Sequence, residues 1–479
     1  MEARQSTPSL MSRNPLYQVS EDERPNSVVV VGGGLVGVTT AYYLARAGFQ
    51  VQVLEKRKNV CDTTTVGDAG ALRLVSSETF ARPSSVFAAL RSLLGLPALR
   101  DVPGEEENDY VNFDRACLRD SQFASWAWTF VKKSFSSGRA ERDLAMRRLI
   151  YASHGLFLSL IEEEKMAVPV TQGSLEIYRN HQSLMTALEN ARVRSIEHKI
   201  PFEVLQPDEL YAAHPYLRNS SLPTEALSGA IYYPKDVSVD STLFVKEMER
   251  ICREKYNVQF HYNTTMKNVV VEEDRVVGVQ THQKHCCRPE FENADGSASA
   301  RLFTADAYVF CVGAQASSEE MPPSLSLPVY PVKSYSMTAP TLASALKYKP
   351  TSLLLDNERR VYYTPLSESL RASSVAEFSP HPEPTQEIVS SLYQVASKTL
   401  PLAAQWEKSQ MWRGVRPVSA DGLPIVSRTP LQNAFLNAGH GSGAFRTALG
   451  SGYAISSILS GSGHTTRGVP LAPLHMERF

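Results

Sequence analysis

The sequence predicts an α/β fold, α+β overall, in which a Rossmann-like parallel sheet is combined with an antiparallel sheet and helices. Three observations predict it. Four consecutive valines at 28–31 run into a glycine-rich turn, and strand-like segments crowd residues 327–377. A second glycine-rich strand-to-helix junction follows at 434–443. Valine runs of this kind are typical of strands buried on both faces of a parallel sheet.

The first junction is the most informative stretch. Gly32, Gly34 and Gly37 fit the pattern G-x-G-x-x-G, and a helical pattern follows as far as Gly48. The first glycine permits a tight turn, the second lets a pyrophosphate approach the backbone, and the third lets the helix pack against the strand. The order of these parts predicts a site for an ADP-containing dinucleotide.

A second expected strand at 49–54 delivers Glu55, which is placed to accept hydrogen bonds from ribose hydroxyls. An acid here argues against a 2′-phosphate, although Lys56 and Arg57 beside it keep NADP open. The motif alone does not distinguish NAD from FAD.

Composition describes an ordinary globular protein. The chain has 479 residues, 43% hydrophobic and 21% charged residues, and a formal net charge of −1. The charge gives no reason to expect nucleic acid as a partner, because that would need a basic stripe. Six cysteines in this length do not make a disulfide framework. No apolar run approaches the roughly 20 residues of a membrane helix.

These features favour an intracellular protein, cytoplasmic rather than mitochondrial, and leave room for peripheral membrane contact. Residues 1–26 are polar, contain three prolines and one acidic cluster, and are expected to be a disordered tail. A weak resemblance to a mitochondrial presequence is the alternative. Residues 282–287 have metal-ligand types without a zinc spacing, so a hairpin loop is expected there.

The last third of the chain favours FAD. A strand at 434–437 leads to the glycines at 439, 441 and 443 and to a helix that ends before Gly461. The N–H groups at the start of that helix could meet the pyrimidine end of a flavin, where negative charge develops on reduction. An NAD enzyme has no need of this second site.

These motifs together resemble the D-amino-acid dehydrogenase group within the FAD-dependent family that also holds D-amino-acid, glycine and sarcosine oxidases. The resemblance runs from about Val28 to Gly461. It is carried by the first junction through Glu55, the region of Trp126 and Trp128, and four later segments. Those segments are 328–336, 414–417, 421–426 and 436–441.

The resemblance implies an FAD-binding domain assembled from three segments and a substrate domain of helices on an antiparallel sheet. We expect the FAD-binding domain at 27–85, 225–320 and 405–463, the substrate domain at 86–224 and 321–404, and a C-terminal tail at 464–479.

The family also implies a carboxylate-binding arginine in its Gly-x-Arg-Pro motif, here Arg416. A guanidinium can grip a substrate carboxylate through two charge-assisted hydrogen bonds. The alternative for Arg416 is a structural ion pair. Tyr330 and Tyr335 could close the pocket or be simple sheet packing. His440 is a candidate base, although the glycines beside it suggest that its backbone matters more.

The candidate cofactor contacts come from both junctions and from two small-residue turns. They are Gly32, Gly34, Leu35, Val36, Gly37, Glu55, Lys56, Gly70, Gly313, Gly439, Gly441, Ser442 and Gly443.

The expected activity is oxidation of a D-amino acid to a 2-oxo acid and ammonia, with electrons passed to a quinone or another acceptor. The alternatives are a glycine- or sarcosine-type oxidase that uses oxygen, and a flavin-binding protein without amino-acid turnover. Three departures from related sequences bear on this: Asp68 in place of Asn, Thr364-Pro365 where arginine is frequent, and Ser373-Ser374 in place of two glycines after Arg371.

Overall fold

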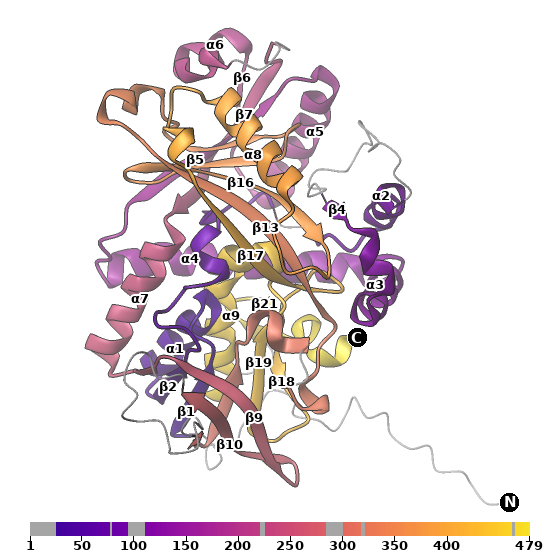
Figure 1. The fold of residues 1–479 in the computed structure, drawn as a ribbon, viewed down its shortest axis with the longest axis vertical. Helices are drawn as coiled ribbons and strands as arrows, with labels where there is room; N and C mark the ends of the chain where they lie inside the picture. The colour runs from indigo at the N-terminus through magenta and orange to yellow at the C-terminus, as the bar shows by residue number, and fades with distance from the viewer. Residues whose placement is uncertain are drawn as a thin grey trace, which may run out of the picture.

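The computed structural model describes residues 25–76, 79–93, 111–220, 226–283, 300–317, 321–461 and 465–479. Most of the expected N-terminal tail and most of the loop after residue 282 lie outside this range. A parallel sheet occupies the lower part of Figure 1 and a larger mixed sheet the upper part. The predicted fold class is confirmed.

The parallel sheet is built around β1. Its strand order is β18 (Ile425–Arg428), β19 (Ala434–Ala438), β12 (Ala307–Phe310), β1 (Ser27–Val31), β2 (Gln50–Leu54), β8 (Gln259–His261). All neighbours are parallel except β18, which runs antiparallel to β19. The valine run therefore lies at the centre of the sheet, as its lack of polar residues predicts.

The two faces of this sheet are covered differently. Val28 and Val30 pack into a core with α1 (Leu35–Arg46), α7 (Ser241–Tyr256) and α9 (Ala444–Leu459). Val29 and Val31 face a second core with a three-stranded sheet of β9 (Thr264–Glu272), β10 (Arg275–Gln283) and β11 (Ala300–Phe303). The period of two along β1 thus sends alternate valines to opposite layers.

The larger sheet has the order β17 (Gln410–Ser419), β13 (Val329–Pro340), β16 (Ser369–Phe378), β15 (Val361–Pro365), β14 (Leu353–Asp356), β5 (Val170–Tyr178), β7 (Gly229–Val239), β3 (Ala71–Leu72). β4 (Val111–Phe113) pairs with β16, and β6 (Glu203–Leu205) pairs with β7. β7 and β17 thus join this sheet, although their residues fall in the ranges expected for the FAD-binding domain. A strand pattern does not say which sheet a strand joins, and the domain boundaries stay a prediction.

Alternation along these strands separates an apolar face from a polar face. Tyr335, Met337 and Ala372 share a core with residues of α8 (Gln386–Thr399) and α6 (Pro207–Ala213). The opposite side, called the polar face below, carries the side chains at the intervening positions. These are Trp412 and Arg416 of β17, Ser334 and Ser336 of β13, Arg371 and Ser373 of β16, Tyr362 of β15 and Glu176 of β5.

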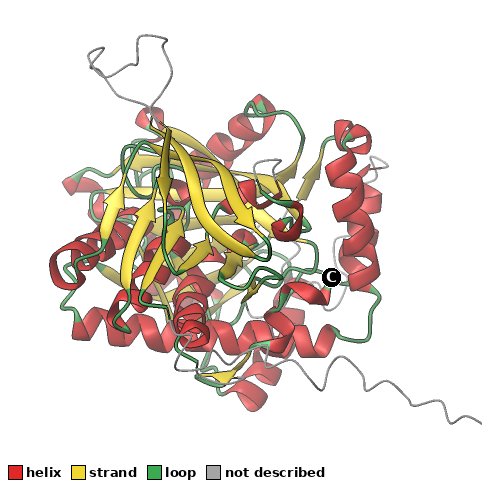
Figure 2. Ribbon diagram, turned by 90° about the horizontal axis from the view of Figure 1, so that it is seen from below, coloured by secondary structure: helices red, strands yellow, loops and turns green. Residues whose placement is uncertain are grey.

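Further helices surround the strands, which occupy the centre of Figure 2. They are α2 (Pro83–Leu93), α3 (Ser121–Ser134), α4 (Arg139–Glu163) and α5 (His181–His198). The segment expected as a C-terminal tail is packed: Leu471 and Leu474 are fully buried, and Arg478 Nε lies 2.7 Å from Asp421 Oδ2. In the described chain, no helix has the length and apolarity to cross a bilayer.

Candidate active site

The first glycine junction connects β1 to α1. Gly32 has φ +111°, and a Cβ added there would overlap the carbonyl oxygen of Cys311. A Cβ on Gly37 would likewise overlap the carbonyl oxygen of Gly32. Gly34 differs, because a Cβ there would meet no protein atom within 4 Å. Two glycines are thus required by protein packing, and the third borders open space.

That open space lies at the N-terminus of α1. Gly34 is the N-cap of α1, no side chain caps the helix, and its first turn holds no acidic residue. The first N–H groups of a helix lack intrahelical partners and favour an anion. The residues around Gly34, including Leu35 and Val36 in the first turn, therefore fit the pyrophosphate of a dinucleotide.

Glu55 lies beside this junction, immediately after β2. Its side chain is buried, and its two carboxylate oxygens accept hydrogen bonds of 2.7 Å from the backbone N–H groups of Gly33 and Arg57. The carboxylate is therefore fixed next to the glycine turn. Lys56 Nζ donates to Gln315 Oε1 at 3.0 Å, which links the end of β2 to the turn that begins at Gly313.

The second glycine junction connects β19 to α9. Gly439 and Gly441 have φ of +73° and +55°, values that favour glycine, and Ser442 is exposed. Gly443 is the N-cap of α9, which has no side-chain cap. Because β1, β12 and β19 are parallel neighbours, both junctions lie at the same edge of the sheet, two strand spacings or about 10 Å apart.

His440 is enclosed within this second junction. Its Nδ1 lies 2.8 Å from Thr447 Oγ1 and its Nε2 lies 2.9 Å from Asn437 Oδ1. Burial lowers the pKa of the ring to about 3, so the imidazole is neutral. Both nitrogens have partners inside the protein, which favours a structural role for the ring over the candidate role of base.

Arg416 lies on the polar face, on the edge strand β17. It pairs with Val332 of β13 and is partly buried. Two residues further along β17, an isolated bridge joins Val418 to His440, so this end of β17 adjoins the second glycine junction. Within the described residues no carboxylate lies within ion-pair distance of Arg416, in contrast to Arg73, Arg179 and Arg478. A guanidinium without such a partner is free to receive a carboxylate ligand.

The loop of residues 61–70 connects β2 toward β3 across the polar face. Thr64 Oγ1 donates to the Val415 carbonyl at 2.8 Å, Thr364 Oγ1 donates to the Ala69 carbonyl at 3.0 Å, and Arg371 Nη1 donates to the Asp68 carbonyl at 2.7 Å. Small residues allow this close passage. A Cβ on Gly70, which has φ +60°, would overlap the Val239 carbonyl oxygen.

Trp412 was missed by the sequence reasoning. A Cβ on either Gly67 or Gly414 would overlap its indole ring, so the ring lies in a slot between the 61–70 loop and β17. It is two residues from Gly414 and four from Arg416 on the same face of the strand. Gly67 and Gly414, which border the two sides of the ring, were visible in the sequence, but only the fold brings them together.

The two candidate tyrosines lie in different surroundings. Tyr330 is fully buried, its hydroxyl donates to Asp120 Oδ2 at 2.8 Å, and its ring stacks on Phe378. Tyr335 points to the apolar face, the side of the sheet opposite Arg416, and its hydroxyl donates to Glu377. Burial raises the pKa of both hydroxyls. The structure therefore does not bring Tyr335 and Arg416 together.

A buried charged cluster was also not expected. Arg73, directly after β3, forms ion pairs with Glu176 and with Asp236 Oδ2, the latter at 3.5 Å. Its Nη1 also lies 3.4 Å from the Tyr362 hydroxyl. Burial raises the pKa of Asp236. Two acids thus surround one arginine on the polar face.

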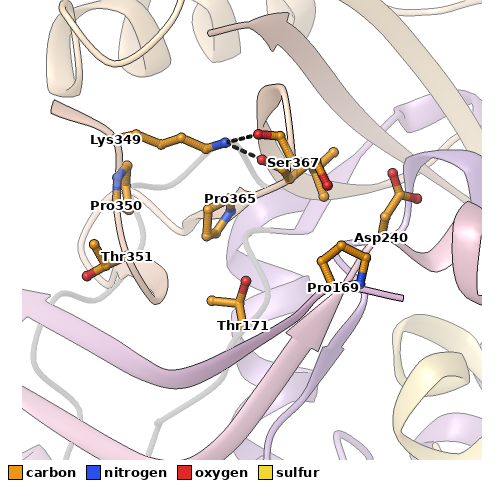
Figure 3. Close-up of a pocket in the computed structure, with 9 residues that line it drawn as sticks. Pro169, Thr171, Asp240, Lys349, Pro350, Thr351, Pro365 and Ser367 are labelled. Carbon is orange, nitrogen blue, oxygen red and sulfur yellow. Dashed lines mark hydrogen bonds between the residues drawn. The ribbon is translucent and has the colours of Figure 1, made fainter. Parts of the chain in front are cut away.

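A pocket of about 300 Å³ lies at the ends of β5, β7 and β15 in the large sheet, where Lys349 Nζ donates to the carbonyls of Leu366 and Ser367 (Figure 3). It is lined by Pro169, Thr171, Asp240, Lys349, Pro350, Thr351, Pro365, Leu366 and Ser367. None of these is a residue expected from the sequence to bind cofactor or substrate.

Comparison with known proteins agrees with this geometry. The sequence model of the family described as FAD dependent oxidoreductase (DAO) matches residues 27–458. A D-amino acid dehydrogenase from Methylobacterium radiotolerans is 31% identical over 444 residues, which cover 91% of this chain and 96% of the relative.

Solved structures show the same fold. The glycine oxidase of Geobacillus kaustophilus has a TM-score of 0.64 at 18% identity, with 94% of this chain and 98% of that chain covered. The L-proline dehydrogenase of P. horikoshii has a TM-score of 0.62 at 17% identity, with 95% and 98% covered.

Proposed function

Because the chain belongs to the FAD dependent oxidoreductase (DAO) family and uses FAD, we propose that it oxidises the Cα–N bond of a D-amino acid and passes the electrons to a quinone or another acceptor. The observation that carries this proposal is Arg416, a guanidinium without a carboxylate partner in the described chain, on a face that adjoins the second glycine junction. The similarity to a D-amino acid dehydrogenase supports the choice of D-amino acids.

In the proposed reaction, the amino acid loses two electrons and two protons and becomes an imino acid. Water then adds to the C=N bond, and ammonia leaves to give a 2-oxo acid. FAD, when bound, supplies the acceptor for the two electrons. The glycine junctions would hold its pyrophosphate at α1 and its ring system near α9, where uncapped N–H groups favour negative charge.

The protein's own part is orientation. Arg416 would bind the substrate carboxylate through two hydrogen bonds and so fix the position of Cα. Holding the reacting atom in place in this way raises the reaction rate. The 61–70 loop and Trp412 would cover the polar face and limit the access of water. No proton-transferring side chain is required if the amine binds in its neutral form.

A second candidate is a glycine- or sarcosine-type amine oxidase that uses oxygen. The structural similarity to glycine oxidase favours considering it, although at 18% identity that similarity concerns the fold. A flavin-binding role without amino-acid turnover is the third.

Anaerobic mixing of the FAD-bound protein with D- and L-amino acids and sarcosine separates these candidates. Bleaching of the flavin by D-isomers supports the proposal, bleaching by sarcosine or glycine supports the second candidate, and no bleaching by any amine leaves the third. Reoxidation by air against a quinone analogue then identifies the acceptor.

Arg416→Leu tests the assigned role. We expect bleaching by substrate to fall at least about 100-fold while the flavin stays bound, because a carboxylate anchor contributes several kcal/mol. Arg413→Leu is the matched control, since Arg413 lies three residues away on the opposite face of β17. Equal loss in both variants, or loss of flavin from Arg416→Leu, would contradict the role.

A further inference from the structure

Two neighbouring helices at the edge of the molecule, α2 and α3, expose large apolar side chains (Figure 1). Among the described residues, the three most exposed phenylalanine and tryptophan side chains are Phe87 of α2, Trp128 of α3 and Phe135, the C-cap of α3, at 57%, 68% and 57%. Leu90, one helical turn after Phe87 on the same side of α2, is 51% exposed. The rings of Phe87 and Phe135 meet edge to face, with their centroids 6.4 Å apart, so the two helices present one continuous surface. Exposed apolar surfaces of this kind mark interaction sites.

The spacing along α3 separates a side that packs from a side that does not. Trp126 and Phe130 are buried in a core beneath the helix, where their rings stack with centroids 5.3 Å apart. Trp128, Lys132 and Phe135 follow one another at intervals of four and three residues and lie on the outer side. The inner side therefore fixes α3 to the body of the protein, and the outer side keeps its apolar residues in solvent.

The charge on this surface has one sign. Residues 83–93 and 121–139 contain no aspartate or glutamate, although the whole chain has 50 of them in 479 residues. The same two segments contain four basic residues, which are Arg91, Lys132, Lys133 and Arg139. Lys132 is exposed between Trp128 and Phe135. The surface is therefore apolar and electropositive together.

This combination fits the surface of an anionic lipid bilayer. Aromatic and leucine side chains enter the boundary between head groups and acyl chains, and basic side chains attract anionic head groups. A second copy of this chain fits less well. A twofold interface would place the surface against itself and bring like charges together, which is unfavourable.

We propose that α2 and α3 dock the protein on an anionic bilayer surface through Phe87, Leu90, Trp128, Lys132 and Phe135, called the docking face below. The bilayer would receive side chains only, at the depth of the head groups. This inference goes beyond the proposed function, because vesicle binding is measured without substrate and without turnover.

The docking face lies close to the second glycine junction. On the inner side of α3, Trp126 Nε1 donates to the Val418 carbonyl at 2.9 Å, and Val418 forms the isolated bridge to His440. One helix, about 10 Å across, thus separates the docking face from the strand that adjoins the junction. Docking would hold the junction near the bilayer surface.

Sedimentation of the FAD-bound full chain with lipid vesicles tests the proposal. Vesicles of phosphatidylcholine with about 30% phosphatidylglycerol should bind at least about fivefold more protein than vesicles of phosphatidylcholine alone. The binding should weaken as the salt concentration rises, because salt screens exposed charges. No binding to the anionic vesicles, or equal binding to both kinds, would overturn the proposal.

Variants on and off the docking face locate the contact. F87S and W128S combined should weaken binding to the anionic vesicles at least about tenfold, and K132E at least about fivefold. L302S and K267E are the matched controls, because Leu302 is 51% exposed, Lys267 is exposed, and both lie on the sheet of β9, β10 and β11. All these side chains are exposed, so circular dichroism and flavin content should stay unchanged. Equal loss of binding in the control variants would overturn the docking face.

Trp128 reports whether the docking face itself meets the lipid, because it is the most exposed of the four tryptophans of the chain. Anionic vesicles should shift the tryptophan emission to shorter wavelength, and brominated lipids should quench it. W128F should keep most of the binding and lose both signals. Binding without a change in emission would place the contact on another face and overturn the proposal.

Sedimentation velocity without lipid tests the alternative occupant. We expect a sedimentation coefficient that is the same for the wild type and W128S over a wide range of protein concentration. A concentration-dependent dimer that W128S abolishes, together with no binding to anionic vesicles, would assign this surface to a second copy of the chain and overturn the bilayer as its partner.

Discussion

Single residues at the first junction separate the demands of folding from the demands of ligand binding. Gly37 is required because its Cβ would overlap the Gly32 carbonyl oxygen, whereas Gly34 borders space that no described protein atom fills. The two glycines belong to one motif, and a sequence pattern gives them equal weight. The structure predicts that their alanine variants behave differently.

We expect Gly34→Ala to leave the free energy of unfolding of the FAD-free protein within about 0.5 kcal/mol of the wild type, because the new methyl group meets only open space. Its Kd for FAD should rise at least about tenfold, since the methyl group stands where the pyrophosphate approaches. Gly37→Ala should instead lose about 1–3 kcal/mol of stability through overpacking. Chemical denaturation and FAD titration measure both, and equal destabilisation in the two variants would refute the distinction.

Among elements, β13 shows how a period of two assigns neighbouring residues to different roles. Ser334 and Ser336 face the same side as Arg416, and Tyr335 between them faces the apolar core. The hydroxyl of Tyr335 donates a hydrogen bond to Glu377 and accepts one from the backbone N–H of Thr385 at 3.1 Å. The same Glu377 carboxylate forms an ion pair with Lys333 Nζ at 3.0 Å. Tyr335 is therefore part of a buried polar network behind the sheet.

Tyr335→Phe should reduce the free energy of unfolding by about 1–3 kcal/mol, because it removes a buried hydrogen bond to a charged group. The rate of flavin reduction by substrate should stay within about twofold of the wild type. Urea denaturation and stopped-flow absorbance measure the two effects. A large loss of rate with unchanged stability would return Tyr335 to the list of catalytic candidates.

The junction between β19 and α9 carries a pH dependence through His440. Burial lowers the pKa of the His440 ring to about 3 in the folded state, while an unfolded histidine has a pKa near 6.5. Between these values the unfolded state binds more protons, so the contribution of His440 to stability is complete above about pH 6.5 and is lost as the pH falls toward 3. The slope in this window approaches 1.4 kcal/mol per pH unit.

His440→Gln should flatten the dependence of the free energy of unfolding on pH between 7 and 5 relative to the wild type. His381→Gln should not, because that side chain is largely exposed. Denaturant titrations at several pH values compare the three proteins. If the free energy of unfolding depended on pH equally in the wild type and in His440→Gln, the pKa of His440 could not be lowered by folding, and the prediction would be wrong.

For the molecule as a whole, local sequence patterns determine more of the candidate cofactor site than of the candidate substrate site. The valine run, the glycines and Glu55 are neighbours in sequence, so their geometry follows from one strand–turn–helix–strand unit. The polar face assembles residues from β5, β13, β15, β16 and β17, and its membership depends on sheet order and register. The slot for Trp412 needs Gly67 and Gly414, which are far apart in sequence and meet only in the fold.

The Arg73 cluster joins the segment directly after β3 to β5 and β7 of the large sheet, and we expect its loss to affect the whole molecule. Arg73 is 2% exposed and is held by Glu176 on β5 and Asp236 on β7.

Arg73→Met should lower the free energy of unfolding by about 3–5 kcal/mol, because it leaves two buried carboxyl groups without their cation. Asp236→Asn should cost less, since burial already raises the pKa of that carboxyl group and one acid remains for Arg73. Thermal and urea unfolding compare the variants. Glu358→Gln is the control, because Glu358 also pairs with an arginine, Arg179, but is more exposed to solvent. If Asp236→Asn were as damaging as Arg73→Met, both acids would have to be charged in the folded protein, and Arg73 would then balance two full negative charges, one on β5 and one on β7.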